Sequence, residues 1–274
     1  MIPARFDYEV AESVAHASEL LGSRDDAKAL AGGHSLLPAM KLRIARPSLL
    51  VDLGRLSELR YVREDGDSIA IGALTRHHDL VNDELLRSQC SLISATAALV
   101  GDPQVRHRGT IGGSVAHGDP ASDLPTTLLA LEADFVVQGP DGTRTVAARD
   151  FFTGVFETAL GPRDVLTEIR VPKLGAGGSS YVKFNRRAQD WATVGVAAVR
   201  ANGGARVALT SMGATPLRAA GVEEALASGS EPAAAAERAA EGTSPPSDTN
   251  GSAEYRAALA KILVRRALEE ALAG

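Results

Sequence analysis

The chain has 274 residues, a length that predicts about two domains. Its 45% apolar and 23% charged side chains are typical of a globular protein. Its net charge of −5 and its aromatic content of 4% argue against a nucleic-acid surface or a base-stacking platform. The single cysteine, Cys90, excludes an internal disulfide, a cysteine-based zinc site and a cysteine-ligated iron–sulfur cluster. No apolar run reaches the roughly 20 residues that span a bilayer, and the acidic start is unlike a secretory signal, so a cytoplasmic protein is expected.

Residues 1–55 have the pattern of a small unit of helices and strands. Apolar residues at helical spacing predict a helix over 14–21, which Gly22 is placed to end. Residues 28–31 predict a strand that leads directly into a glycine pair, and residues 49–53 predict a buried strand.

Residues 56–174 predict a second unit of the same class. Alternating apolar residues predict a strand over 68–74, after which Thr75 is placed to cap a helix, and a second helix is expected over 92–100. A hairpin is predicted over 135–147, because its Pro-Asp-Gly centre is typical of a turn, and a last strand ends at Pro172.

The remaining residues predict strands followed by helices. A linker is expected at 175–180. Three antiparallel strands are expected, at 181–187, 193–200 and 206–212, and the turn sequence Asn202-Gly203-Gly204 is expected to join the last two as a hairpin. The alanine-rich remainder predicts helices around a polar loop at 242–251, and the last helix carries a predicted apolar stripe of Tyr255, Leu259, Ile262 and Leu263. The fold class predicted from these patterns is α+β, with two α/β units followed by a strand-plus-helix domain.

Two glycine pairs with hydroxyl neighbours are the chemically informative segments. The first segment is Ala31, Gly32, Gly33, His34 and Ser35, and the second is Thr110, Ile111, Gly112, Gly113 and Ser114. Consecutive backbone N–H groups around such a pair can converge on one anion, and two facing hollows would suit the pyrophosphate of a dinucleotide. Plain turns remain the alternative, since neither a G-x-G-x-x-G nor a Walker A sequence is present.

The histidines raise the alternative of a metal-dependent hydrolase. His77, His78 and His117 each have an aspartate within two residues, and imidazole with carboxylate can hold zinc. His77 and His78 are adjacent and point in different directions on a helix, so no metal site is expected. The charged residues 106–108 are interpreted as a solvated or partner-facing cluster.

The stretches AGGHSLLPAMKLR and GTIGGSVAHGDPASDLP resemble the paired flavin-binding motifs of the FAD subunit of molybdenum-containing hydroxylases, which include aerobic carbon monoxide dehydrogenase and xanthine dehydrogenase. The resemblance extends to IGALT, VKFNRRAQDWATVGVA and the SDTNGSAEYRAALAKILVRRALEEAL tail. It implies a vanillyl-alcohol-oxidase/PCMH-like FAD-binding domain over 1–174, with subdomains 1–55 and 56–174. A C-terminal domain of the carbon monoxide dehydrogenase flavoprotein type, with a three-stranded sheet and a helical bundle, would occupy 175–274.

The resemblance also implies a set of FAD-binding residues and no catalytic or metal-ligating residue. The two glycine segments would wrap the pyrophosphate with backbone amides and with the hydroxyls of Ser35 and Thr110. Asp123 would contact the cofactor, cap a helix, or do both. The other implied contacts are Val100, which would line the flavin pocket, and Leu166, which would contact the cofactor through its backbone. Lys183 would lie near the flavin, unless it is a solvated surface group. Trp191 would lie near the isoalloxazine, unless it is a core or interface anchor.

The activity implied by the resemblance is electron transfer through FAD. Substrate would be oxidised at a molybdopterin centre on a large subunit, and electrons would cross [2Fe–2S] clusters on a small subunit to FAD here and then to an external acceptor. AGGHSL is most similar to the carbon monoxide dehydrogenase branch, and the alternatives are a xanthine- or nicotine-type dehydrogenase or a non-redox nucleotide-binding scaffold. A cytoplasmic dimer of heterotrimers is implied, with peripheral association at the inner membrane face left open.

Overall fold

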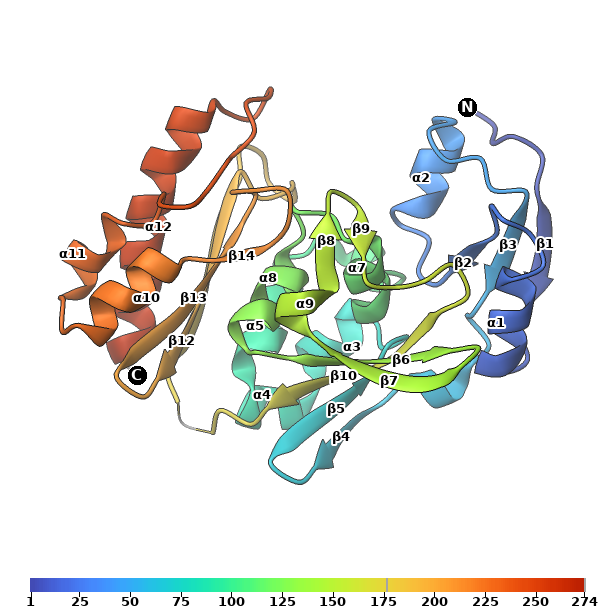
Figure 1. Cartoon of the computed structure of the whole chain (residues 1–274), viewed down its shortest axis with the longest axis horizontal. Coiled ribbons are helices and arrows are strands. Elements are labelled where there is room, and N and C mark those ends of the chain that lie inside the picture. Colours follow the sequence, from blue (N-terminus) through green and yellow to red (C-terminus); the bar gives the residue numbers. More distant parts are fainter. Residues whose placement is uncertain (176, 274) are drawn as a thin grey trace.

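A computed structural model of the chain describes residues 1–175 and 177–273, and it consists of three sheet-based parts in a row (Figure 1). The N-terminal part holds three parallel strands in the order β1-β3-β2. Its elements are β1 (Asp7–Val10), α1 (Val14–Leu21), β2 (Lys28–Leu30), α2 (Leu36–Lys41) and β3 (Leu49–Asp52). Ser13 caps α1 by accepting from the His16 N–H, and Gly22 ends it, as the helical spacing predicted.

The central part is a five-stranded antiparallel sheet in the order β4-β5-β10-β6-β7, with helices between its strands. Its strands are β4 (Val62–Asp65), β5 (Ser68–Gly72), β6 (Asp134–Gly139), β7 (Gly142–Ala147) and β10 (Val165–Pro172), with a separate hairpin of β8 (Phe152–Gly154) and β9 (Glu157–Thr158). Its helices are the 3₁₀ turn η1 (Ser57–Leu59), α3 (His77–Asn82), α4 (Glu84–Gln89), α5 (Ser91–Ala98), α6 (Pro103–Arg106), α7 (Ile111–His117), α8 (Asp123–Ala130) and α9 (Ala148–Phe151).

The helix predicted after Thr75 differs from the structure in two respects. The segment forms two short helices, α3 and α4, and Asp83 begins the second by accepting from the Leu86 N–H. Thr75 caps neither helix, because its hydroxyl is occupied with the backbone N–H and carbonyl of Tyr61. The hydroxyl oxygen of the buried Thr75 is satisfied by the backbone just before β4, so another residue begins the helix.

The C-terminal part contains a four-stranded antiparallel sheet in the order β11-β12-β13-β14. Its elements are β11 (Ser179–Phe184), β12 (Val194–Ala201), β13 (Gly204–Thr210), β14 (Leu217–Arg218), α10 (Ala220–Ala227), α11 (Pro232–Ala236) and α12 (Ala253–Ala273). The short edge strand β14 makes four strands where three were predicted. Of the predicted linker 175–180, residue 176 lies outside the described residues, as does residue 274 at the end of the predicted domain, while 179–180 begin β11.

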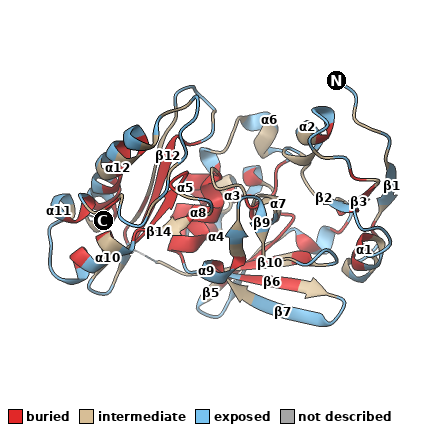
Figure 2. Ribbon diagram, turned by 45° about the horizontal axis from the view of Figure 1, so that its top comes forward, coloured by how far each residue is buried: buried red, intermediate tan, exposed pale blue. Residues whose placement is uncertain are grey.

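The C-terminal sheet lies between two layers of helices. Helices α10 to α12 cover one face, and α5 and α8 of the central part contact the other (Figure 1). This packing buries α8 and most of β12, whereas β7 at the far edge of the central sheet is exposed (Figure 2). The predicted apolar stripe on α12 is half right, because Leu259 and Leu263 are buried but Tyr255 and Ile262 are exposed. Among the described helices, none combines the length and the apolar character needed to cross a bilayer.

Candidate functional site

The first glycine segment, residues 31–35, connects the end of β2 to the start of α2. Gly33 has a φ of +75°, a backbone conformation that a side chain would strain. In the part of the chain that the structure describes, no acceptor is recorded for the backbone N–H groups of Gly32, Gly33, His34 and Ser35. Because unpaired amides at a glycine turn before a helix attract negative charge, this segment has the geometry of an anion-binding loop.

The second glycine segment, residues 110–114, differs from the predicted hollow. It is the capped start of α7, and the amides of residues 111–114 already have acceptors. The four bonds run from Ile111 to the Thr75 carbonyl, from Gly112 to the Ala73 carbonyl, from Gly113 to the Thr110 hydroxyl and from Ser114 to the Thr110 carbonyl. Among the described residues, the groups that this segment can still offer to a ligand are therefore the backbone N–H of Thr110 and the hydroxyl protons of Thr110 and Ser114.

The glycines of both segments allow the backbone to pack closely. A Cβ added at Gly112 would lie 2.6 Å from the Ala73 carbonyl oxygen, so glycine lets α7 approach the end of β5. A Cβ added at Gly32 would overlap the backbone carbonyl of Arg108, just before the second segment, and one at Gly113 would lie 3.8 Å from the Ala31 Cβ. The two segments, far apart in the sequence, are thus in contact.

A pocket of about 310 Å³ opens beside this contact, and its charge favours an anion. It is lined by Ala31 and Thr110 from the two segments, and otherwise by Asp52, Gly54, Arg55, Arg60, Leu74, Arg76 and Arg108. Among the described residues, Arg55, Arg76 and Arg108 have no ion-pair partner within 4 Å. Unneutralised guanidinium groups next to unpaired amides suit phosphate oxygens.

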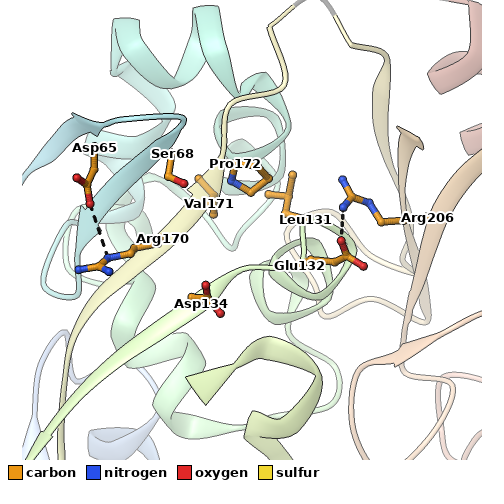
Figure 3. A pocket seen from close by; sticks show the side chains of 9 residues that line it. All are labelled: Asp65, Ser68, Leu131, Glu132, Asp134, Arg170, Val171, Pro172 and Arg206. Carbon is orange, nitrogen blue, oxygen red and sulfur yellow. Dashed lines mark hydrogen bonds and ion pairs between the residues drawn. The ribbon is translucent and has the colours of Figure 1, made fainter. Parts of the chain in front are cut away.

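A second pocket, of about 380 Å³, lacks this character (Figure 3). It lies between the central sheet and β13, and its two arginines are paired with acids of the same pocket, Arg206 with Glu132 and Arg170 with Asp65 at 3.9 Å. Because the charges there are already neutralised, the pocket beside the glycine segments is the candidate site.

Asp123 lies at the boundary between the central part and the C-terminal sheet. It is the first residue of α8, whose N-cap is Ser122, so the capping role considered for Asp123 is wrong. Its carboxylate instead accepts from the Tyr181 hydroxyl at 2.6 Å and from the Lys183 ammonium at 2.8 Å. Burial raises the pKa of the Asp123 carboxyl, and Lys183 opposes that shift.

Lys183 is not the solvated group that a lysine on a strand suggests. Its side chain is 5% exposed, and its ammonium group also donates to the Leu99 carbonyl at 3.2 Å. Tyr181, two residues earlier on β11, is missing from the predicted site, yet burial and the adjacent Asp123 hold its pKa well above the usual value. The alternation of a strand places Tyr181 and Lys183 on one face, and this signal was available in the sequence.

The other predicted residues lie in different surroundings. Val100 is half-buried after α5, and Leu166 is 6% exposed in the core of β10. Trp191 is 51% exposed in the segment between β11 and β12. That segment is tied to the loop after α7 by Ser211, whose N–H donates to the Pro120 carbonyl and whose hydroxyl donates to the Ala192 carbonyl.

Comparison with known protein families shows which family this chain belongs to. Residues 4–174 match the family described as FAD binding domain in molybdopterin dehydrogenase, and residues 179–271 match the CO dehydrogenase flavoprotein C-terminal domain. The chain belongs to the FAD-binding medium subunits of the molybdenum-containing hydroxylases. It is therefore a subunit of an oxidoreductase with FAD as its cofactor.

Similar proteins match this medium subunit from end to end. The carbon monoxide dehydrogenase medium chain of Hydrogenophaga pseudoflava is 44% identical, with 100% of this chain and 99% of that protein covered. A solved structure of carbon monoxide dehydrogenase from that organism superposes with a TM-score of 0.96 at 46% identity, over 100% of this chain and 99% of the other. The 6-hydroxypseudooxynicotine dehydrogenase complex subunit alpha of Paenarthrobacter nicotinovorans is 39% identical, over 99% and 96%. The predicted family, fold class and cofactor are confirmed, whereas the roles of single residues stay predictions.

Proposed function

We propose that this medium subunit holds FAD with its diphosphate against the first glycine segment and conducts electrons from [2Fe–2S] clusters of a small partner subunit to an external acceptor. The complex that we propose is an aerobic carbon monoxide dehydrogenase. The observation that supports this proposal is the group of four unpaired amides at 32–35 beside an arginine-lined pocket.

In this proposal each part of the site binds or orients the cofactor. The amides of residues 32–35 donate to phosphate oxygens, and Arg55, Arg76 and Arg108 offset the diphosphate charge. The Thr110 oxygen accepts from the Gly113 N–H and leaves the hydroxyl proton for a phosphate oxygen. FAD, when bound, supplies electron exchange in single or paired steps.

The buried group of Asp123, Tyr181 and Lys183 would fix the two domains around the flavin end of the site. It joins α8 to β11 through the hydrogen bonds that the Asp123 carboxylate accepts from Tyr181 and Lys183. Val100, Leu166 and Trp191 complete the proposed cofactor-binding set. None of these residues is placed to act on the substrate, which is oxidised on a partner subunit.

Carbon monoxide is the proposed substrate because the relative at 44% identity carries that name, against 39% for the relative named for 6-hydroxypseudooxynicotine. A dehydrogenase for an aromatic or N-heterocyclic substrate is the second candidate. The proposed partners are a large molybdopterin subunit and a small iron–sulfur subunit, in a cytoplasmic dimer of heterotrimers with peripheral association at the inner membrane face.

The experiment is anaerobic reduction of the purified complex by carbon monoxide, followed by absorption spectroscopy. We expect loss of both the iron–sulfur and the flavin absorption, whereas the isolated chain binds FAD but does not react with carbon monoxide. Substrate oxidation by the isolated chain would contradict the proposal, and reduction by xanthine or nicotine alone would favour the second candidate.

A matched variant separates flavin transfer from substrate oxidation. Gly32→Val should empty the FAD site, because its side chain would overlap the Arg108 carbonyl. Carbon monoxide should still reduce the iron–sulfur clusters of that complex, while reduction of the external acceptor is lost. Full turnover without FAD would refute the proposed electron path.

A further inference from the structure

His77 is a buried side chain beneath the second glycine segment. It is the first residue of α3, its backbone N–H donates to the Gly109 carbonyl, and the residue is 2% exposed. A Cβ added at Gly109 would lie 3.0 Å from the ring Nε2, so glycine there makes room for the imidazole. The ring is therefore fixed against the backbone that precedes α7.

The two ring nitrogens of His77 have different surroundings. Nε2 lies 3.3 Å from the Ser114 hydroxyl oxygen, while the buried Nδ1 has no partner in the described part of the chain. Burial, with the nearby charges of Arg106 and His34, lowers the pKa of His77 to about 4. The ring is consequently neutral at physiological pH and carries one proton.

The position of that proton decides what Ser114 can do. A proton on Nδ1 would bury an unpaired N–H, at a cost of about 1–3 kcal/mol, and would make Nε2 accept the serine proton. A proton on Nε2 leaves only an unpaired lone pair at Nδ1 and donates to the Ser114 oxygen. The serine hydroxyl then keeps its own proton free for another acceptor.

We propose that His77 is a positioning residue, held with its proton on Nε2 so that it donates to Ser114 and keeps the serine proton available to an anionic oxygen of the cofactor. The half-buried Ser114 follows Gly113, whose added Cβ would lie 3.8 Å from the Ala31 Cβ of the first segment, and His34 of that segment is close enough to His77 to affect its pKa, so the pair of His77 and Ser114 lies beside the first segment. This inference rests on the proposed FAD site and assigns His77, initially a metal candidate, to it.

The first test is a double-mutant cycle read as FAD affinity of the full chain after removal of bound FAD. His77→Leu should weaken binding about fivefold, because the serine loses its oriented partner. His77→Gln should restore binding to within about twofold, since its amide N–H can replace Nε2–H. In a Ser114→Ala background His77→Leu should have no further effect.

The control for this cycle is His78→Leu, the exposed neighbour that stacks on His107 with ring centroids 4.0 Å apart. FAD affinity should be unchanged there. Equal or tighter FAD binding by His77→Leu would overturn the proposal, because it would mean that the imidazole competes for the serine proton. An equal loss in the Ser114→Ala background would overturn it as well.

The second test reads the tautomer without any cofactor. Nitrogen NMR of the FAD-free chain, labelled with ¹⁵N-histidine, should show His77 protonated at Nε2 and bare at Nδ1. A proton on Nδ1 in a chain that binds FAD contradicts only the His77 assignment. A chain that binds no FAD contradicts the proposed function itself.

Discussion

The ammonium group of Lys183 lies 2.8 Å from a carboxylate oxygen of Asp123, and both side chains are almost completely buried, at 5% and 6% exposure. The pair joins β11 of the C-terminal sheet to α8 of the central part. A buried charge that loses its partner is costly, because water cannot replace the missing interaction. The two parts of the chain are therefore coupled through this pair.

Removing one partner should destabilise the chain strongly. Lys183→Met leaves the buried Asp123 carboxylate without its counter-charge, and we expect a loss of about 3 kcal/mol in the free energy of unfolding, measured by urea denaturation. Arg149→Met is the control, because its pair with Asp150 is 80% and 66% exposed, and it should cost less than about 0.5 kcal/mol. Similar small losses in both variants would show that the buried pair is not coupled as described.

Gly32 should be intolerant of even a methyl group. Gly32→Ala places a Cβ against the Arg108 carbonyl, so the two glycine segments must separate. We expect a loss of about 1–3 kcal/mol in stability and at least about a tenfold loss of FAD affinity by fluorescence titration.

Gly66→Ala is the control for this substitution. Its φ of +60° strains an alanine, but nothing lies within 4 Å of the added Cβ. It should cost about 1 kcal/mol and leave FAD affinity unchanged. Unaltered FAD binding by Gly32→Ala would argue against contact between the segments.

His77 should make the folded chain sensitive to mild acid. Its pKa of about 4 in the folded state lies below the 6.5 of a free histidine, so below pH 6.5 the unfolded chain binds the extra proton. The full stability is present above pH 6.5 and falls by up to about 3 kcal/mol as the pH drops toward 4. The free energy of unfolding, measured by denaturation at several pH values, should lack this contribution to the acid-induced loss in His77→Leu. Identical pH profiles for the variant and the unchanged chain would refute the prediction.

Trp191 is the sole tryptophan, and the proposed function places it near the flavin. If it lies near the isoalloxazine, FAD should quench its emission strongly, whereas ADP, which lacks that ring, should not. Trp191→Phe provides the blank. Equal responses to FAD and ADP would place the flavin elsewhere.

The sequence predicted the parts of the fold that depend on local chemistry. The Asn202–Gly204 turn does join two strands, β12 and β13, and Gly22 does end α1, because these glycines act within a few residues. Tyr255 and Ile262 proved exposed, because helical spacing shows that a stripe exists but not how much of it the sheet covers.

The candidate site could be predicted from the sequence only in part, because local patterns do not show which distant groups they meet. Paired glycines marked both segments, but whether an amide is free depends on distant acceptors, here the carbonyls of Ala73 and Thr75 that occupy those of α7. The arginine-lined pocket was missed because only the tertiary fold brings its residues to these segments, whereas the strand alternation that places Tyr181 beside Lys183 was present in the sequence.

The most direct test of the central claim follows individual backbone amides of the ¹⁵N-labelled chain by NMR while FAD is added. The account predicts large shifts for the amides of residues 32–35 and small ones for those of 111–113, which already have acceptors. Shifts confined to 111–113 in a chain that binds FAD would contradict it.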